Sequence, residues 1–184
     1  MNSAVEFKDV DILFSKGGRD GRRDLREAVA ALDGGASRTD IQNKHGVIVG
    51  VAGANLSVAR GEISVLMGLS GSGKSTLLRA ANGLNPVTRG HVWVRDGESA
   101  IDVATCDTRQ MRRLRRERVA MVFQQFGLLP WRTVADNVGL GLELRGVAAG
   151  ERREIVRRQL HLVGLEQWAD RYAQHGIGGT VGPA

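Results

Sequence analysis

Residues 68–76 read GLSGSGKST, and this stretch is the most informative in the sequence. It fits the pattern of a glycine, four variable residues, and then Gly-Lys-Ser/Thr, with Gly68, Gly73, Lys74 and Ser75 at the fixed positions. Glycines permit backbone angles and close approaches that a Cβ atom would block, so successive N–H groups can turn inward around phosphate oxygens. The stretch therefore predicts a phosphate-binding loop.

Each part of the loop has a predicted task. Lys74 is expected to bridge the β- and γ-phosphates of ATP, and the hydroxyl of Ser75 is expected to ligate Mg²⁺. Thr76 adds a hydroxyl near the α-phosphate, and a helix that starts near Lys74 points its positive end at the same place. The candidate nucleotide contacts in the loop are Gly68, Ser70, Gly71, Ser72, Gly73, Lys74, Ser75 and Thr76.

The flanks of the loop argue against a Gly/Ser-rich linker, which is the alternative interpretation. Before the loop, Ile63, Val65 and Met67 alternate with other residues as in a strand. After it, KSTLLRAANGL has helical spacing and ends at Asn-Gly. A linker would have polar flanks, so nucleotide binding is favoured.

Composition sets limits on the class of protein. The 184 residues are 42% apolar and 25% charged, which is typical of a globular domain. The excess of 26 basic over 20 acidic residues is concentrated in MRRLRRER at 111–118, and no aromatic residue lies between those arginines. This pattern favours a solvated helix face over a nucleic-acid surface, so we expect no nucleic-acid partner. The alternative predicts oligonucleotide binding with a steep salt dependence.

Other sequence features exclude further kinds of site. Cys106 is the only cysteine, which rules out an intramolecular disulfide and a cysteine-cluster metal site. No apolar stretch approaches the roughly 20 residues of a membrane span, and the N-terminal residues lack the layout of a signal peptide. We therefore expect neither a transmembrane segment nor a signal peptide.

Hydrophobic periodicity predicts a mixed α/β part followed by a helical part. Strands are expected at 5–10, on both sides of an Ala-Arg-Gly turn at 59–61, at 90–97 and at 119–123. A short helix ending at Gly34 and Gly35 is expected within a peripheral segment, and a polar helix is expected from about Asp107. From Thr133 onward the pattern is helical.

The stretch MVFQQFGLLPWRTVADNV at 121–138 resembles the Q-loop region of ABC transporter ATPases. The resemblance implies that Gln124 contacts Mg²⁺ and the attacking water; a glutamine that merely caps a strand is the alternative. The adenine-stacking aromatic of that family lies shortly after the first strand, which corresponds to Phe14. A core position for Phe14 is the alternative, because stacking on a base requires only an exposed ring.

The resemblance extends from about Val5 to Tyr172 and is greatest to the ATPase subunits of glycine betaine and choline importers, which also carry an extra segment comparable to 15–51. It implies an α/β P-loop NTPase of the ABC type within one partial ATPase domain. A nucleotide-binding lobe at 1–132 would combine an antiparallel β subdomain with part of a parallel core sheet. A helical subdomain would follow at 133–184.

The same resemblance implies a function. The chain would bind ATP and Mg²⁺, with Ser75 and Gln124 as metal ligands, and would couple ATP binding and hydrolysis to quaternary-amine uptake. Its partners would be transmembrane permease subunits, a second ATPase subunit arranged head to tail and, indirectly, a substrate-binding protein. The place implied is the cytoplasmic face of the inner membrane.

The C-terminal residues RYAQHGIGGTVGPA depart from the family pattern. Gly178 and Gly179 keep the register of the signature loop, but Gly176 and Ile177 stand where the family has leucine and serine. The family's Walker B aspartate, the glutamate after it and the switch histidine would follow Ala184.

Asp33 and Asp102 follow short apolar runs, but neither is a credible Walker B residue. The expectation is a C-terminally incomplete domain, and binding of nucleotide or partner subunits without turnover is the alternative function. A P-loop small-molecule kinase is a further alternative, but it leaves FQQFGLLPW unexplained.

Overall fold

An antiparallel sheet organises the first part of the chain. The structure, a computed structural model, describes residues 3–16, 21–123 and 127–173. The strands are β1 (Ser3–Phe14), β2 (Ile48–Ala59), β3 (Arg89–Asp96) and β4 (Ser99–Asp102), in the order β2-β1-β3-β4. All three neighbouring pairs are antiparallel. The chain forms two compact units, Met1–Met121 and Val122–Ala184.

Two helices pack against one face of this sheet. They are α3 (Lys74–Ala80), which follows the phosphate-loop pattern, and α4 (Thr108–Glu117). Their buried residues Leu77, Ala80 and Leu114 join the apolar side chains of the strands in one core. Alternation along β3, where Val92 and Val94 are buried, directs every second side chain into that core. Helix α3 is therefore packed on this core through Leu77 and Ala80.

Arginines of the 111–118 cluster hold α4 to its neighbours. Arg115 donates from Nε to the carbonyl of Asn82 at 2.8 Å and from Nη2 to that of Gly83 at 3.0 Å. Arg113 and Arg118 form ion pairs with Asp96 at 3.1 and 2.7 Å. The cluster therefore has structural partners in addition to its solvated side.

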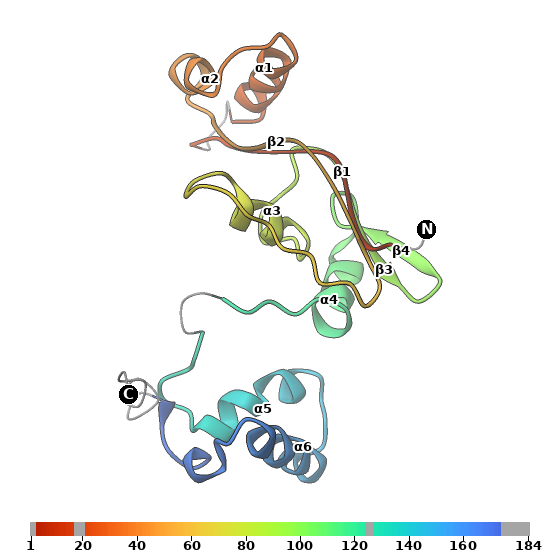
Figure 1. The fold of residues 1–184 in the computed structure, drawn as a ribbon, viewed down its shortest axis with the longest axis vertical. Coiled ribbons are helices and arrows are strands. Elements are labelled where there is room, and N and C mark those ends of the chain that lie inside the picture. The colour runs from red at the N-terminus through yellow and green to blue at the C-terminus, as the bar shows by residue number, and fades with distance from the viewer. Residues whose placement is uncertain (1–2, 17–20, 124–126, 174–184) are drawn as a thin grey trace. The chain divides into compact units, whose positions relative to one another are not determined.

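The segment between β1 and β2 forms a small subassembly with its own core. It contains α1 (Gly21–Asp33) and α2 (Arg38–His45), which lie at one end of the β1–β2 pair (Figure 1). The chain leaves β1 at Phe14 and enters β2 at Ile48, and these two residues are paired in the sheet. The buried residues of this subassembly are Leu13, Ala28, Ile41, Val47 and Val49.

A buried ion pair ties this subassembly to the sheet. The side chain of Asp11 is 1% exposed and accepts from Arg89 Nε at 2.6 Å and from Gly53 N at 2.7 Å. Arg89 Nη1 also donates to both carboxylate oxygens of Asp33, at 2.8 and 2.7 Å. The hydrogen bonds that Arg89 donates to Asp33 and Asp11 raise the pKa of its guanidinium above the ordinary value. One guanidinium thus joins β1, β3 and the end of α1.

The second unit is helical. It contains α5 (Val134–Leu144), α6 (Ala149–Leu162) and a 3-10 turn, η1 (Glu166–Trp168). Thr133 caps α5 by accepting from the backbone N–H of Asp136, and a buried cluster forms around Val156 and Leu160. Among the described residues, no helix is both long enough and apolar enough to cross a bilayer.

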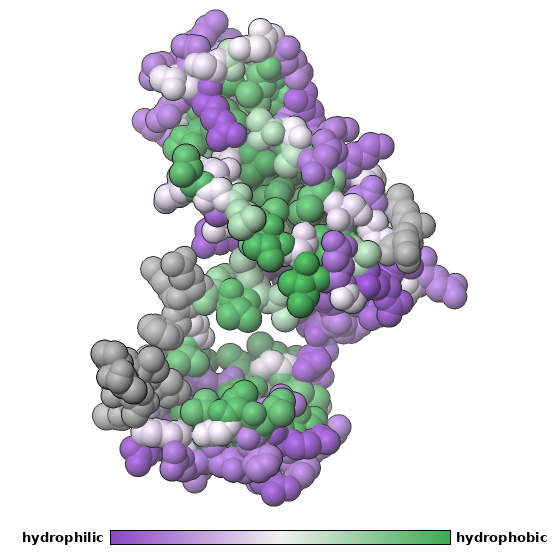
Figure 2. Space-filling view, viewed as in Figure 1, coloured by the Kyte–Doolittle hydropathy of each residue, from purple (hydrophilic) through white to green (hydrophobic). Residues whose placement is uncertain are grey.

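Two segments that the sequence predicts as strands have no ladder partner. Residues 62–69 and 119–123 form no strand, and the described sheet contains no parallel pair. Ile63 is 91% exposed and Val122 is 97% exposed. Figure 2 shows that apolar side chains reach the surface of the first unit. The prediction of a partial parallel core sheet was therefore wrong for the described residues, because an apolar segment becomes a strand only when its backbone groups find a partner.

Candidate functional site

The loop at 68–76 adopts backbone angles that favour glycine. Gly68, Gly71 and Gly73 have φ values of +151°, +79° and +93°. The N–H of Ser72 donates to the carbonyl of Leu69 at 3.2 Å, which closes a turn inside the loop. Residues with a Cβ atom rarely adopt such φ angles, so the three glycines allow the backbone curvature that a phosphate cradle needs.

Lys74 folds back across the loop. Its Nζ atom donates to the carbonyls of Gly68 at 2.8 Å and Leu69 at 2.7 Å, and to Ser72 Oγ at 3.1 Å. The ammonium group therefore lies where the pattern predicts a cation for phosphate. Phosphate oxygens are charged acceptors and bind an ammonium more strongly than neutral carbonyls do. The cradle and the cation fit a nucleotide's phosphates.

The loop is held in place by a close approach to β2. A Cβ atom built on Gly73 would collide with the carbonyl oxygen of Gly50 and meet Val51 Cγ2 at 3.3 Å. On the other side, a Cβ atom on Gly50 would lie 2.8 Å from Phe14 Cε2 and 3.1 Å from Thr76 Cγ2. The two glycines thus let the start of α3 pack directly against the β2 backbone.

Side chains from outside the motif bind the start of α3 and the turn that follows the helix. Asn85 Nδ2 donates to the carbonyl of Thr76 at 3.0 Å. Asn82 accepts from the N–H of Leu84 at 3.1 Å, and its own carbonyl accepts from Arg115. One of these bonds is made to the first turn of α3, and the others are made within and to the turn at 82–84. They fix α3 while its first turn faces the loop.

The structure brings some predicted site residues together and leaves others undescribed. Phe14 is half-buried at the edge of the main core and lies on the same side of Gly50 as Thr76. Gln124 lies outside the described residues, and so do Gly176, Ile177, Gly178 and Gly179.

Metal ligands beyond the loop hydroxyls are not gathered in the described ranges. Residues 3–16, 21–123 and 127–173 contain no cluster of three or more His, Cys, Asp or Glu side chains that could hold a metal ion. Asp33 is paired with Arg89. Asp102 binds His91 at 2.8 Å and two backbone N–H groups. Both aspartates thus have structural partners.

Gly50 is a site residue that the sequence reasoning missed. Its signal was available, because a glycine inside a strand pattern often marks a close approach of another backbone. The capping contacts of Asn85 and Arg115 had no such signal, since they depend on where α4 and the loop after α3 lie in space.

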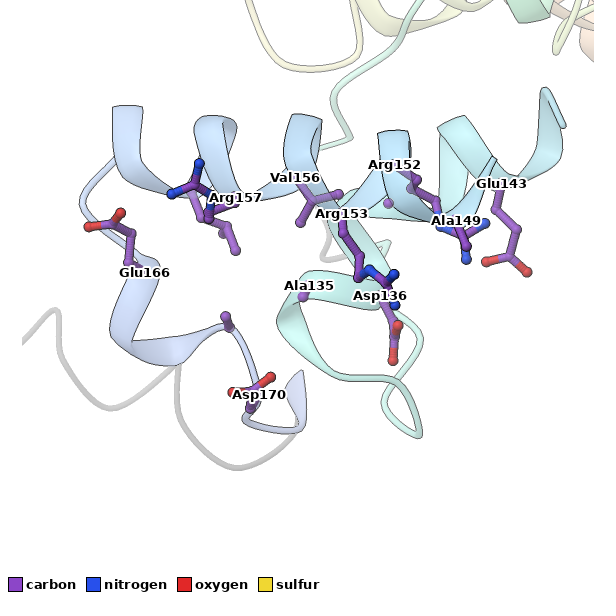
Figure 3. A pocket seen from close by; sticks show the side chains of 13 residues that line it. Ala135, Asp136, Glu143, Ala149, Arg152, Arg153, Val156, Arg157, Glu166 and Asp170 are labelled. Carbon is purple, nitrogen blue, oxygen red and sulfur yellow. The ribbon is translucent and has the colours of Figure 1, made fainter. Parts of the chain in front are cut away.

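A cavity in the second unit was also not predicted. Its volume is about 550 Å³, and α5, α6 and the turn after them line it. Asp136 from α5 and Arg153 from α6 are among the charged residues that line it (Figure 3). Val156 and Leu160 contribute to an apolar floor, while charged side chains of both signs form the rim.

Comparisons with known proteins agree with the loop geometry. Residues 51–180 match the family model described as ABC transporter. The chain is 45% identical over 154 residues to the glycine betaine/proline betaine transport system ATP-binding protein of Salmonella typhimurium, covering 84% of this chain and 38% of that protein. It is 42% identical over 177 residues to the glycine betaine/carnitine transport ATP-binding protein of Listeria monocytogenes, covering 96% and 42%.

A solved structure is similar to this chain in its fold. A dimeric ATP-binding cassette in a post-hydrolysis state, bound to ADP and Pi, matches with a TM-score of 0.70 and 27% identity. The match covers 95% of this chain and 64% of that one. The chain spans less than half the length of the two curated relatives above.

Proposed function

Because this chain belongs to the ABC transporter family, we propose that it is the ATP-binding subunit of an importer for quaternary amines such as glycine betaine or choline. The observation that carries the proposal is the loop with three glycines at positive φ and with Lys74 across it. The substrate class comes from the names of the relatives. ATP binding is proposed for these residues, and hydrolysis and uptake are proposed for the assembled transporter.

Binding would exchange the internal contacts of Lys74 for contacts with phosphate. The ammonium would leave the carbonyls of Gly68 and Leu69 and bridge the β- and γ-phosphates, while the loop N–H groups bind the remaining oxygens. Ser75 and Gln124 would hold Mg²⁺, which neutralises charge on the phosphates when bound. Phe14 would stack on the adenine.

Binding without turnover is the second candidate function. It is supported by the contacts of Asp33 and Asp102, which pair with Arg89 and His91. Neither carboxylate is available to orient an attacking water at the loop. Without such a group, the charge that develops during hydrolysis is poorly stabilised.

The cavity between α5 and α6 is the proposed docking site for a permease subunit. An apolar floor around Val156 with a mixed charged rim suits an amphipathic helical segment from a membrane partner. The other proposed partners are a second ATPase subunit arranged head to tail and, indirectly, a substrate-binding protein. The proposed location is the cytoplasmic face of the inner membrane.

The ATP-binding proposal is tested with Lys74→Ala. This change removes the mobile cation of the loop, so we expect ATP affinity to fall by about two orders of magnitude, the scale of a lost charge-assisted bond. Equilibrium binding of ATP with Mg²⁺ is the measurement, and Lys44→Ala is the control because Lys44 lies on α2. Unchanged affinity in Lys74→Ala would refute the assignment. Turnover measured beside binding separates the two candidate functions.

The docking proposal is tested with Arg153→Glu. Reversing a charge on the cavity rim should weaken co-purification of the permease subunit about tenfold. Arg158→Glu is the matched control, because it makes the same change on α6 away from the cavity lining. Equal effects of the two variants would show that general charge, and not this cavity, governs association.

A further inference from the structure

Trp93 presents an indole ring on the face of the sheet opposite the main core. One side of the ring is covered by His91, with ring centroids 4.9 Å apart and planes within 12° of parallel. His91, Trp93 and Arg95 project from the same face of β3, because side chains two residues apart share a face. Arg95 therefore follows Trp93 along this face, on the side away from His91.

Trp93 and Arg95 line a cavity of about 270 Å³, and His91 is not part of its lining. Its lining residues are Ser3, Glu6, Trp93, Arg95, Glu98, Ser99 and Ala100. Glu6 is paired directly with Trp93 across β1 and β3, so its carboxylate stands beside the indole. Glu98 comes from the turn between β3 and β4.

The lining leaves two carboxylates uncommitted. Within the part of the chain that the structure describes, neither Glu6 nor Glu98 has an ion-pair partner. Arg95 instead donates to the backbone carbonyls of Ser3 at 3.2 Å and Gly97 at 3.3 Å. Two carboxylates against one occupied guanidinium give the cavity a net negative charge.

We propose that this cavity binds a small organic cation with a trimethylammonium group. Such a group has a diffuse charge and an apolar surface, so contact with an aromatic face is favourable. It has no N–H and therefore donates no hydrogen bond. The indole supplies that face, and Glu6 and Glu98 supply the compensating charge. This proposal is independent of the proposed ATP site, since the two sites share no residue.

The size of the cavity fits this ligand class. It is somewhat smaller than the 300–1,000 Å³ typical of sites for drug-sized ligands. A quaternary ammonium head enters such a space, whereas a nucleotide or a folded peptide segment does not. The alternative ligand is a lysine side chain from another protein, which has the same charge but a strongly hydrated ammonium group. The test below distinguishes a trimethylammonium group from such a lysine.

The test titrates the 184-residue chain with tetramethylammonium and choline in the absence of ATP, at ionic strength matched with NaCl. Saturable binding is measured by calorimetry and by the shift of the Trp93 indole N–H resonance. Trp93→Leu should weaken binding about tenfold, the scale of a desolvated cation–π contact. Trp93→Phe should retain part of the affinity because it keeps an aromatic face. The double variant Glu6→Gln/Glu98→Gln should lose affinity for the cation although its indole ring is unchanged.

Matched controls define the outcomes. Trp131→Leu removes an exposed tryptophan outside the cavity and should leave binding unchanged. Circular dichroism verifies that each variant is folded. Absence of saturable binding, or equal binding by wild type and by the double glutamine variant, overturns the proposal. Equal or tighter binding of lysine amide would replace the ligand class with a partner's basic side chain and overturn it as well.

Discussion

Among single residues, Phe14 is the position where packing and the proposed stacking on adenine would compete. Its ring touches the edge of the main core and also lies beside the first turn of α3. If the ring stacks on adenine, Phe14→Leu should lower the affinity for ATP about tenfold and leave the affinity for pyrophosphate nearly unchanged, since only ATP carries a base. Competition binding with both ligands is the measurement.

The control for this prediction is Phe14→Tyr, which keeps an aromatic face and should bind ATP almost as wild type. Equal losses for ATP and pyrophosphate in Phe14→Leu would instead assign the ring to packing. The place of the ring between the core and α3 explains why the position of Phe14 in the sequence left both interpretations open.

At the scale of elements, the joint between the phosphate loop and β2 depends on Gly73. An alanine there must adopt φ near +93° and displace the Gly50 carbonyl. Gly71→Ala adopts a similar angle of +79° but meets nothing within 4 Å, so it serves as the matched control. We expect Gly71→Ala to lower the free energy of unfolding by about 1–2 kcal/mol and Gly73→Ala by about 1–3 kcal/mol more.

Urea denaturation of both variants measures this difference. Gly73→Ala should also lose ATP affinity, because a backbone shift at the start of α3 moves the N–H groups of the cradle. Equal destabilisation by the two variants would mean that the backbone angle, and not the approach to β2, is what requires glycine at position 73.

The elements that sequence reasoning predicted are those defined by local signals. The helix after Lys74, the polar helix capped by Asp107 and the helix capped by Thr133 all have start signals and apolar spacing, and all are present. The ABC-type fold class is confirmed by the match to solved cassettes. Helix α2 was missed because its residues are mostly polar, although Ser37 with Asp40 and Gly46 mark its two ends.

Elements that depend on distant partners were less predictable. Residues 62–69 have the alternation of a strand, but a strand also requires a neighbour, and periodicity contains no information about one. The same holds for the candidate site. The loop was predictable from its spacing, whereas Gly50 and Asn85 reach it only through the fold.

At the scale of the whole molecule, the two units have separate apolar cores. We expect the chain to unfold with a calorimetric enthalpy larger than the van't Hoff enthalpy, because separate cores need not melt together. Scanning calorimetry measures both quantities. Added ATP should raise the melting temperature of one component only, the one that contains the phosphate loop.

A single sharp transition with equal enthalpies would contradict this expectation and show that the units melt as one. Lys74→Ala provides the control for the ATP effect, since it should abolish the ligand-induced rise and leave the component itself in place.

The pairing of Phe14 with Ile48 has a consequence for engineering this molecule. The segment from 15 to 47 begins and ends on neighbouring strands, whose paired Cα atoms are about 5 Å apart. A two-residue hairpin spans that distance, and so do the adjacent termini of many small domains. A folded guest in place of this segment would begin and end at one place on its host, and it would have to cover Leu13 and Val49, which now share a core with α1 and α2.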